Sequence, residues 1–150
     1  MIRKAVGAIV KHGDEFLLVH KVKIMNSQSS PIGIKGEWDF PKGGVKPTDT
    51  DMTKALLREL EEETGSDQYV IIKEFEELLS FKFSASLQKR LGFERQETTM
   101  FLVEYMGEMT NLVPQDEEID QIEFFSREEV IERLFHEETR DFFKKHAYDS

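Results

Sequence analysis

The feature that most constrains this chain is the segment RELEEETG (58–65), which places four glutamates within five positions near the end of a predicted helix. We predict that helix over residues 51–64, because a threonine or aspartate at 48–50 can cap its start. Gly65 suits the left-handed position just past its end. Charge runs of this kind usually form a solvated face, so the helical phase must decide where these side chains point.

The helical phase places most of these carboxylates on the apolar side. At about 100° per residue, with Glu59 at zero, Glu63 lies at about +40° and Glu62 at about −60°. The apolar residues of the same helix fall within this arc: Met52, Ala55 and Leu56. Lys54 and Glu61 lie on the opposite side, where solvent is expected. Three carboxylates therefore continue the apolar stripe of their own helix.

Carboxylates in such a position need cations. They repel one another and lose hydration, which costs several kcal/mol for each unpaired ion. Arg58 can pair with Glu62 at a spacing of four residues, but one arginine cannot neutralise three carboxylates. Clustered oxygen ligands suit Mg²⁺ or Mn²⁺. We therefore predict that Glu59, Glu62 and Glu63 hold divalent metal.

A glycine turn, FPKGGVKP (40–47), precedes this helix by a few residues. Gly43 and Gly44 permit backbone conformations closed to other residues and let a ligand approach the chain. Lys42 adds a cation beside that backbone. Taken alone, the turn is a weak signal. Next to the acidic helix, it predicts a pocket in which a metal-bound polyphosphate meets Lys42 while its cations meet the glutamates.

Composition limits the class of protein. The 150 residues, 39% hydrophobic and 33% charged, fit a single domain over 1–150 with a proper core. The sequence has neither an apolar run near 18 residues nor a recognisable signal peptide. Without cysteine, a cytoplasmic location is the default expectation. The net charge of −10 argues against a broad nucleic-acid groove, but it permits a phosphorylated small substrate bridged by cations.

The remaining segments predict an α/β fold with a mixed sheet between helices. The expected strands are residues 4–12, 16–22, 37–40, one or two within 69–83, 97–106 and 121–126. Residues 127–135 and 137–147 are expected to be helices, the first started by a capping box of Ser126 and Glu129. Residues 23–36 and 84–94 are expected to be loops.

The segment GVKPTDTDMTKALLRELEEETGS (44–66) resembles the signature of the Nudix hydrolase family, which includes MutT. It aligns without a gap, and the matching positions are Gly44, Arg58, Glu59, Leu60, Glu62, Glu63 and Gly65. Thr50 stands where the signature has its first glutamate, and Ser66 where it has an aliphatic residue. Asp49 or Asp51 can take over the helix-dipole or ion-pair role of that glutamate. The resemblance covers nearly the whole chain and implies the Nudix α/β/α sandwich.

The resemblance also implies an activity and roles for residues. It implies metal-dependent hydrolysis of a nucleoside diphosphate linked to another group, with Mg²⁺ or Mn²⁺ as cofactor. The implied metal ligands are Glu59, Glu62, Glu63 and the carbonyl of Gly43. Arg58 would orient the glutamates. A further glutamate is expected from a loop, where Glu118 is favoured over its neighbour Glu117, with Glu94 and Glu97 as rivals. The general base is Glu59 or Glu118.

The substrate is the most open point of this prediction. The turn WDFPKGGV (38–45) resembles that of diadenosine tetraphosphate hydrolases, diphosphoinositol-polyphosphate hydrolases and RNA 5′-pyrophosphohydrolases. Dinucleoside polyphosphates are favoured. RNA 5′ ends and nucleoside triphosphates are the alternatives, and a non-catalytic ligand sensor is the competing class. Four basic residues can meet distal phosphates, although each is also typical of a solvated strand end or loop: His20, Lys21, Lys23 and Lys35.

Overall fold

The structure, a computed structural model, describes residues 1–25, 31–115 and 117–146. In these residues, eight strands form one sheet whose main path is β3-β2-β1-β7-β5. The strands are β1 (Ile2–His12), β2 (Glu15–Met25), β3 (Pro31–Asp39), β4 (Lys42–Gly44), β5 (Tyr69–Glu74), β6 (Leu79–Lys82), β7 (Arg95–Tyr105) and β8 (Ile119–Phe125). β1 and β7 pair in parallel, and the other pairs are antiparallel. The predicted mixed sheet is confirmed.

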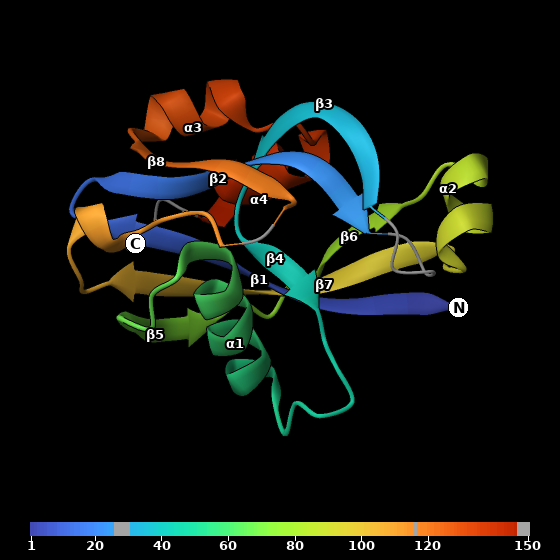
Figure 1. Cartoon of the computed structure of the whole chain (residues 1–150), viewed down its shortest axis with the longest axis horizontal. Helices are drawn as coiled ribbons and strands as arrows, with labels where there is room; N and C mark the ends of the chain where they lie inside the picture. Colours follow the sequence, from blue (N-terminus) through green and yellow to red (C-terminus); the bar gives the residue numbers. More distant parts are fainter. Residues whose placement is uncertain (26–30, 116, 147–150) are drawn as a thin grey trace.

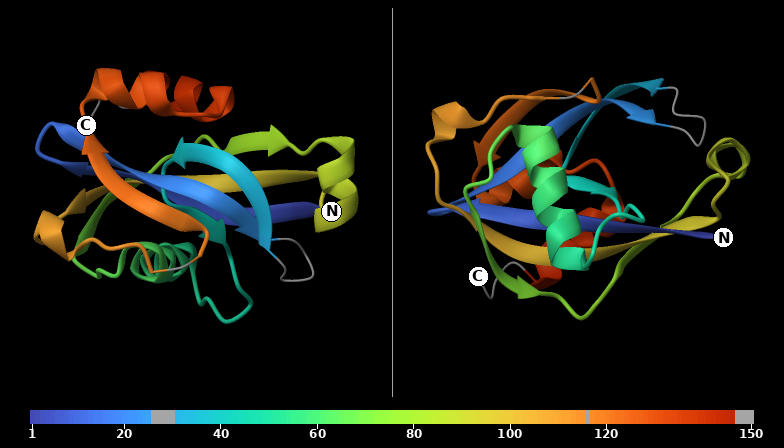
Figure 2. Two further views of the ribbon diagram at one scale, coloured as in Figure 1. Left: turned by 45° about the horizontal axis from the view of Figure 1, so that its top comes forward. Right: turned by 60° about the horizontal axis from the view of Figure 1, so that its bottom comes forward.

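Helices cover both faces of this sheet. They are α1 (Met52–Thr64), α2 (Ala85–Leu91), α3 (Arg127–Arg133) and α4 (Glu137–His146), with a short 3₁₀ turn, η1 (Met109–Asn111). α1 lies against one face, and α3 and α4 lie against the other (Figure 1). α2 stands at one end of the sheet beside the N terminus (Figure 2). The predicted α/β/α sandwich is confirmed.

Alternation along β1 divides the core between the two faces. Val6, Ala8 and Val10 belong to the cluster under α1, whereas Ile9 belongs to the cluster under α3 and α4. The α1 cluster includes Leu56 and Leu60 of the helix itself, both nearly inaccessible to solvent. The apolar half of the α1 stripe therefore docks the helix, and its acidic half projects from the same side.

The prediction of a long loop over 23–36 is wrong for the residues that the structure describes. β2 continues to Met25 and β3 begins at Pro31, with Ile24 opposite Ile32 and Lys23 opposite Gly33. Residues 26–30 lie outside the described part. The polar composition concealed a strand pair because backbone hydrogen bonds, rather than apolar side chains, form its ladder.

The prediction of a loop over 84–94 is also wrong, since α2 lies within it. The Ser84 side chain accepts a hydrogen bond from the Leu87 amide, and Gly92 ends the helix at φ 80°. A serine cap followed eight residues later by glycine was the available signal. The sequence did not reveal this helix because it has no apolar face: Leu91 is the one buried residue among its seven.

The remaining helix ends follow the sequence closely. Asp51, rather than a residue of 48–50, caps α1 by accepting from the Lys54 amide, and Gly65 takes the left-handed conformation at φ 76°. The capping box of Ser126 and Glu129 is present at α3. None of the described helices is long and apolar enough to cross a membrane.

The two left-handed helix ends allow a matched stability test. A Cβ on Gly65 would meet the Gln115 side chain at 2.9 Å, whereas no described atom outside the local turn lies within 4 Å of a Cβ on Gly92. Both alanine variants pay the left-handed penalty of about 1–2 kcal/mol. We predict that Gly65→Ala lowers the free energy of unfolding in urea by more than Gly92→Ala does. Equal losses of unfolding free energy in the two variants would show that the Gln115 side chain moves aside without cost.

Candidate active site

The acidic face of α1 follows the predicted helical phase. The Glu63 side chain is buried, at 3% exposure, and the Glu59 side chain is 14% exposed. Glu61 is exposed, as expected from its opposite direction. Glu62 is more open than predicted, with 42% of its side chain exposed. The helix therefore carries one buried, one half-buried and one accessible carboxylate along a single edge.

Gly43 is needed where it stands because Glu59 lies against it. A Cβ added to Gly43 would overlap the carboxylate of Glu59. β4 pairs with β1 through Gly43 and Val6, which fixes the backbone at this contact. Burial raises the pKa of Glu59, and the neighbouring Arg58 only partly offsets this effect. The prediction of a turn is wrong for Lys42–Gly44, which form the strand β4 without a positive φ at either glycine. The absent side chain of Gly43 instead leaves space for a partly desolvated carboxylate beside this strand.

Arg58 connects the helix α1 to β4 and to the segment before the helix by hydrogen bonds. Its Nη1 donates to Glu59 Oε1 at 2.9 Å and to Glu62 Oε2 at 3.0 Å. Its Nη2 donates to the Gly44 carbonyl at 3.1 Å. Asp49 receives two further bonds, from Nε at 2.9 Å and from Nη2 at 2.8 Å. One guanidinium therefore orients two carboxylates and holds the chain on both sides of the site.

This network shows how the chain accommodates Thr50. The bonds from Arg58 lower the pKa of Asp49 to about 2, so this carboxylate is ionised in the pair. Asp51 separately caps the helix. The two roles anticipated for Asp49 or Asp51 are divided between them, the ion pair to Asp49 and the helix start to Asp51.

Among the loop glutamates, Glu118 is linked to this arrangement through Arg3. It is half-buried, and its carbonyl accepts from the Val22 amide at 2.8 Å, whereas Glu117 is exposed. Glu118 and Glu59 both interact electrostatically with Arg3. The two rivals are engaged elsewhere. Glu94 pairs with the N-terminal ammonium, and Glu97 pairs with Lys4 and Arg95.

The structure does not place Lys42 as predicted. Its side chain is 4% exposed, and its Nζ donates to Asp39 Oδ2 at 3.1 Å and to Thr139 Oγ1 of α4 at 3.0 Å. Gly7 makes room for its stem. The expected contact between Lys42 and a substrate phosphate is therefore corrected, because the ammonium is enclosed in a buried ion pair. The sequence did not reveal Asp39 and Thr139 as its partners.

The other basic candidates also have defined places. His20 Nδ1 lies 2.6 Å from Asp120 Oδ1, and its ring fills the space beside Gly36. Lys21 Nζ lies 3.4 Å from Asp39 Oδ2. The side chains of Lys23 and Lys35 lie outside the described residues.

Arg3 is a basic residue beside the acidic edge that sequence reasoning did not single out. Its Nη2 would lie 2.9 Å from a Cβ on Gly44, and its Nη1 donates to Gln96 Oε1. Burial lowers the pKa of Arg3, and attraction to Glu59 and Glu118 opposes that effect. In the sequence, Arg3 and Lys4 form a basic pair before the apolar run of β1, and such a pair at a strand start is usually exposed.

The donor set fits a hard divalent cation. Carboxylates and a backbone carbonyl are the oxygen ligands that Mg²⁺ and Mn²⁺ prefer, and a partly desolvated glutamate gains from a cation at its side. In the part of the chain that the structure describes, no three acidic or histidine side chains already converge to hold an ion. Arg58 instead bonds Glu59 and Glu62, so these two carboxylates would exchange a guanidinium contact for a metal ion on binding one.

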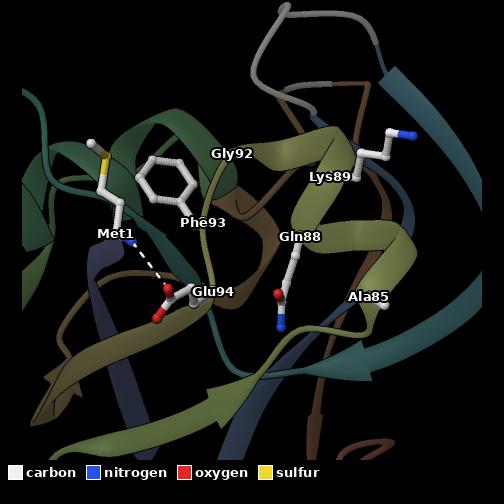
Figure 3. Close-up of a pocket in the computed structure, with 7 residues that line it drawn as sticks. All are labelled: Met1, Ala85, Gln88, Lys89, Gly92, Phe93 and Glu94. Carbon is white, nitrogen blue, oxygen red and sulfur yellow. Dashed lines mark ion pairs between the residues drawn. The ribbon is translucent and has the colours of Figure 1, made fainter.

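A cavity of about 460 Å³ opens at the start of β1, between the N terminus and α2. Its lining residues are Met1, Ala85, Gln88, Lys89, Gly92, Phe93 and Glu94. The Phe93 ring lies beside Met1, whose ammonium pairs with Glu94 at 3.8 Å (Figure 3). Arg3 lies two residues further along the strand, about 7 Å away by strand geometry.

Comparison with known proteins decides the family. The family model described as NUDIX domain matches residues 1–146. This chain belongs to the Nudix family. A Campylobacter jejuni protein named RNA pyrophosphohydrolase is 34% identical over 113 residues, which cover 74% of this chain and 68% of the relative.

Two solved Nudix structures agree in fold. The MutT protein of Methanosarcina mazei has a TM-score of 0.73 at 20% identity, covering 99% of this chain and 94% of that one. The Ap4A hydrolase of Caenorhabditis elegans has a TM-score of 0.70 at 19% identity, covering 98% and 96%. The predicted family and fold are confirmed. At these identities, the two structures support the fold alone.

The buried position of Lys42 predicts a structural effect of its loss. Lys42→Met leaves Asp39 with a weakened set of partners, and breaking a buried pair costs roughly 3–5 kcal/mol. We expect a loss of stability on that scale in denaturant unfolding, with a near-normal KM for the protein that remains folded. Lys54→Met, on the exposed side of α1, is the control. Unchanged stability with a raised KM would restore the phosphate role.

Proposed function

We propose that this Nudix pyrophosphohydrolase uses Mg²⁺ or Mn²⁺ to cleave a pyrophosphate bond at the 5′-polyphosphate end of RNA. The observation that carries the substrate is the 34% identity, over most of the chain, to relatives named RNA pyrophosphohydrolase. The acidic edge of α1, the two glycines of β4 and Arg58 support the reaction class. An intact set of Glu59, Glu62 and Glu63 disfavours a non-catalytic sensor.

In this proposal Glu59, Glu62, Glu63 and the Gly43 carbonyl hold the metal. The bound ion would lower the pKa of water and neutralise charge on the phosphate oxygens. Arg58 is a positioning residue because it touches two of the ligands and the Gly44 carbonyl. Its anchor on Asp49 keeps the guanidinium in place when a carboxylate turns toward metal.

Glu59 is our first choice for the proton acceptor, with Glu118 as the second. A carboxylate whose pKa is raised by burial is the better general base near neutral pH, and burial raises the pKa of Glu59. Glu118 approaches from the β2–β8 side and faces the same Arg3. Both stay proposals, since either acceptor fits the arrangement.

Arg3 replaces Lys42 as our candidate for the phosphate contact. It lies against Gly44 and within electrostatic reach of Glu59, so a phosphate bridging metal and Arg3 would be neutralised on both sides. The cavity beside α2 would take the first nucleoside. A small number of such contacts is enough to bind the 5′ end of an RNA. A chain of net charge −10 does not favour an extended RNA-binding surface.

Dinucleoside polyphosphates, which the sequence favoured, are the second candidate. The WDFPKGGV segment supports them, and they offer the same type of scissile bond. The C. elegans Ap4A hydrolase shares the fold at 19% identity, which carries no argument for substrate. Nucleoside triphosphates are a third possibility for the same panel.

A substrate panel tests this function. We expect release of pyrophosphate or phosphate from 5′-triphosphorylated RNA at a higher kcat/KM than from diadenosine tetraphosphate or nucleoside triphosphates, with Mg²⁺ or Mn²⁺ present. EDTA should abolish turnover, and added metal should restore it. A higher kcat/KM for diadenosine tetraphosphate would reverse the substrate order. Full activity in chelator would refute the metal site.

Two glutamates of α1 provide a matched test of the acidic edge. Glu63→Gln should reduce kcat by at least about 100-fold, the scale for loss of a key electrostatic group. Glu61→Gln, an identical change two residues away on the exposed side, should be nearly silent. Circular dichroism checks that both variants fold. Comparable losses would mean that helix direction does not determine which carboxylates act.

A further inference from the structure

Lys21 is flanked by two irregularities of β2. The pairing with β8 shifts register between His20 and Lys21, and the pairing with β3 shifts between Lys21 and Lys23. On the β8 side His20 faces Gln121 while Lys21 faces Ile119, so Asp120 is the extra residue. Bulges re-aim side chains and are frequent beside active sites. The direction of Lys21 is therefore set by the backbone on both sides.

The Lys21 ammonium belongs to a buried group of three charges. Asp39 lies 3.4 Å from Lys21 and 3.0 Å from Lys42, and Lys42 also bonds Thr139. The side chains of Lys21, Asp39 and Lys42 are 17%, 6% and 4% exposed. The two buried cations are attracted by further carboxylates, Lys42 by Glu138 and Lys21 by Glu63 and Glu118, as a poorly hydrated cation requires.

Two of these carboxylates, Glu63 and Glu118, belong to the candidate active site. The residue after Lys21, Val22, donates its amide to the Glu118 carbonyl at 2.8 Å, which fixes Glu118 beside this part of β2. Glu63 is buried in α1, and its carbonyl accepts from the Gln115 amide at 3.3 Å, three residues before Glu118. Burial alone would lower the pKa of Lys21, but attraction to Asp39, Glu63 and Glu118 outweighs it and raises that pKa.

We propose that Lys21 is a built-in counter-charge of the metal site, anchored on Asp39, which balances Glu63 and Glu118 and competes with a divalent ion for them. The inference rests on the proposed metal site. Lys21 then lowers metal affinity below that of the carboxylates alone, and it stabilises the metal-free protein. Asp39 acts in the opposite sense, because it absorbs part of the charge of Lys21 and Lys42.

Direct Mn²⁺ binding, measured by EPR on substrate-free protein, tests this role without relying on activity. Lys21→Met should bind Mn²⁺ more tightly, on the order of tenfold, because a nearby positive charge is removed. Lys21→Arg should stay close to wild type. Asp39→Asn should bind Mn²⁺ more weakly, since two cations then lack their shared anion. Lys54→Met, the exposed lysine of α1, is the matched control.

Stability without metal gives the second readout. Metal-free Lys21→Met should unfold at lower urea concentration than wild type, and Mn²⁺ should stabilise the variant more than wild type. If Lys21→Met fails to fold, Lys21→Gln replaces it in both measurements, with the same expected direction. A purely structural lysine would lower stability without tightening Mn²⁺ binding.

The outcomes separate the two proposals. Mn²⁺ affinity that is unchanged or weaker in folded Lys21→Met, with normal binding by wild type, would overturn the counter-charge role and leave the metal site intact. Failure of wild type to bind Mn²⁺ would overturn the metal site and this role with it. Tighter binding in Lys21→Met but not in Lys54→Met would support both.

Discussion

The guanidinium of Arg58 is the contact on which the site depends. It bonds Asp49 before the helix, the Gly44 carbonyl in β4 and two carboxylates of α1. Without a cation there, Glu59 and Glu62 would repel each other in a partly desolvated setting. Because a guanidinium offers five donors in a fixed plane, one residue can satisfy all four partners. Lysine, with a compact charge, could not reproduce this geometry.

A second set of charges organises the opposite layer. The Lys42–Asp39 pair reaches Thr139 of α4, and Asp39 also approaches Lys21. The charges of Lys42 and Lys21 outweigh the burial of Asp39 and hold its pKa at about 2. Asp39 is therefore ionised at neutral pH. Through Thr139 and Lys21, the Lys42–Asp39 pair connects α4 to β2. The packing of α4 on one face of the sheet therefore helps to fix the position of the Lys21 charge.

The sequence predicted the site correctly where the helical periodicity and the residue types indicated the same arrangement. The phase of α1 separated Glu59 and Glu63 from Glu61 because a helix docked by Leu56 and Leu60 has only one rotation available. The helix α2 was missed because Leu91 is the one buried residue among its seven, and the strand pair within 23–36 was missed because its sequence is polar and contains Ser, Pro and Gly. Lys42 was misplaced for a different reason. Its partners Asp39 and Thr139 are three and 97 residues away, and only the fold brings the second one near.

The position of Arg3 could not be predicted from periodicity or residue type. A basic residue at the start of a strand is ordinarily solvent-exposed, yet Arg3 at the start of β1 lies beside Gly44, whose missing side chain leaves room for a guanidinium. The same principle places Glu59 against Gly43. Two successive glycines of β4 thus admit an anion and a cation at neighbouring positions. In the proposed function, this local separation of charge lets a chain of net charge −10 attract a phosphate, because a substrate meets the local field rather than the sum over the surface.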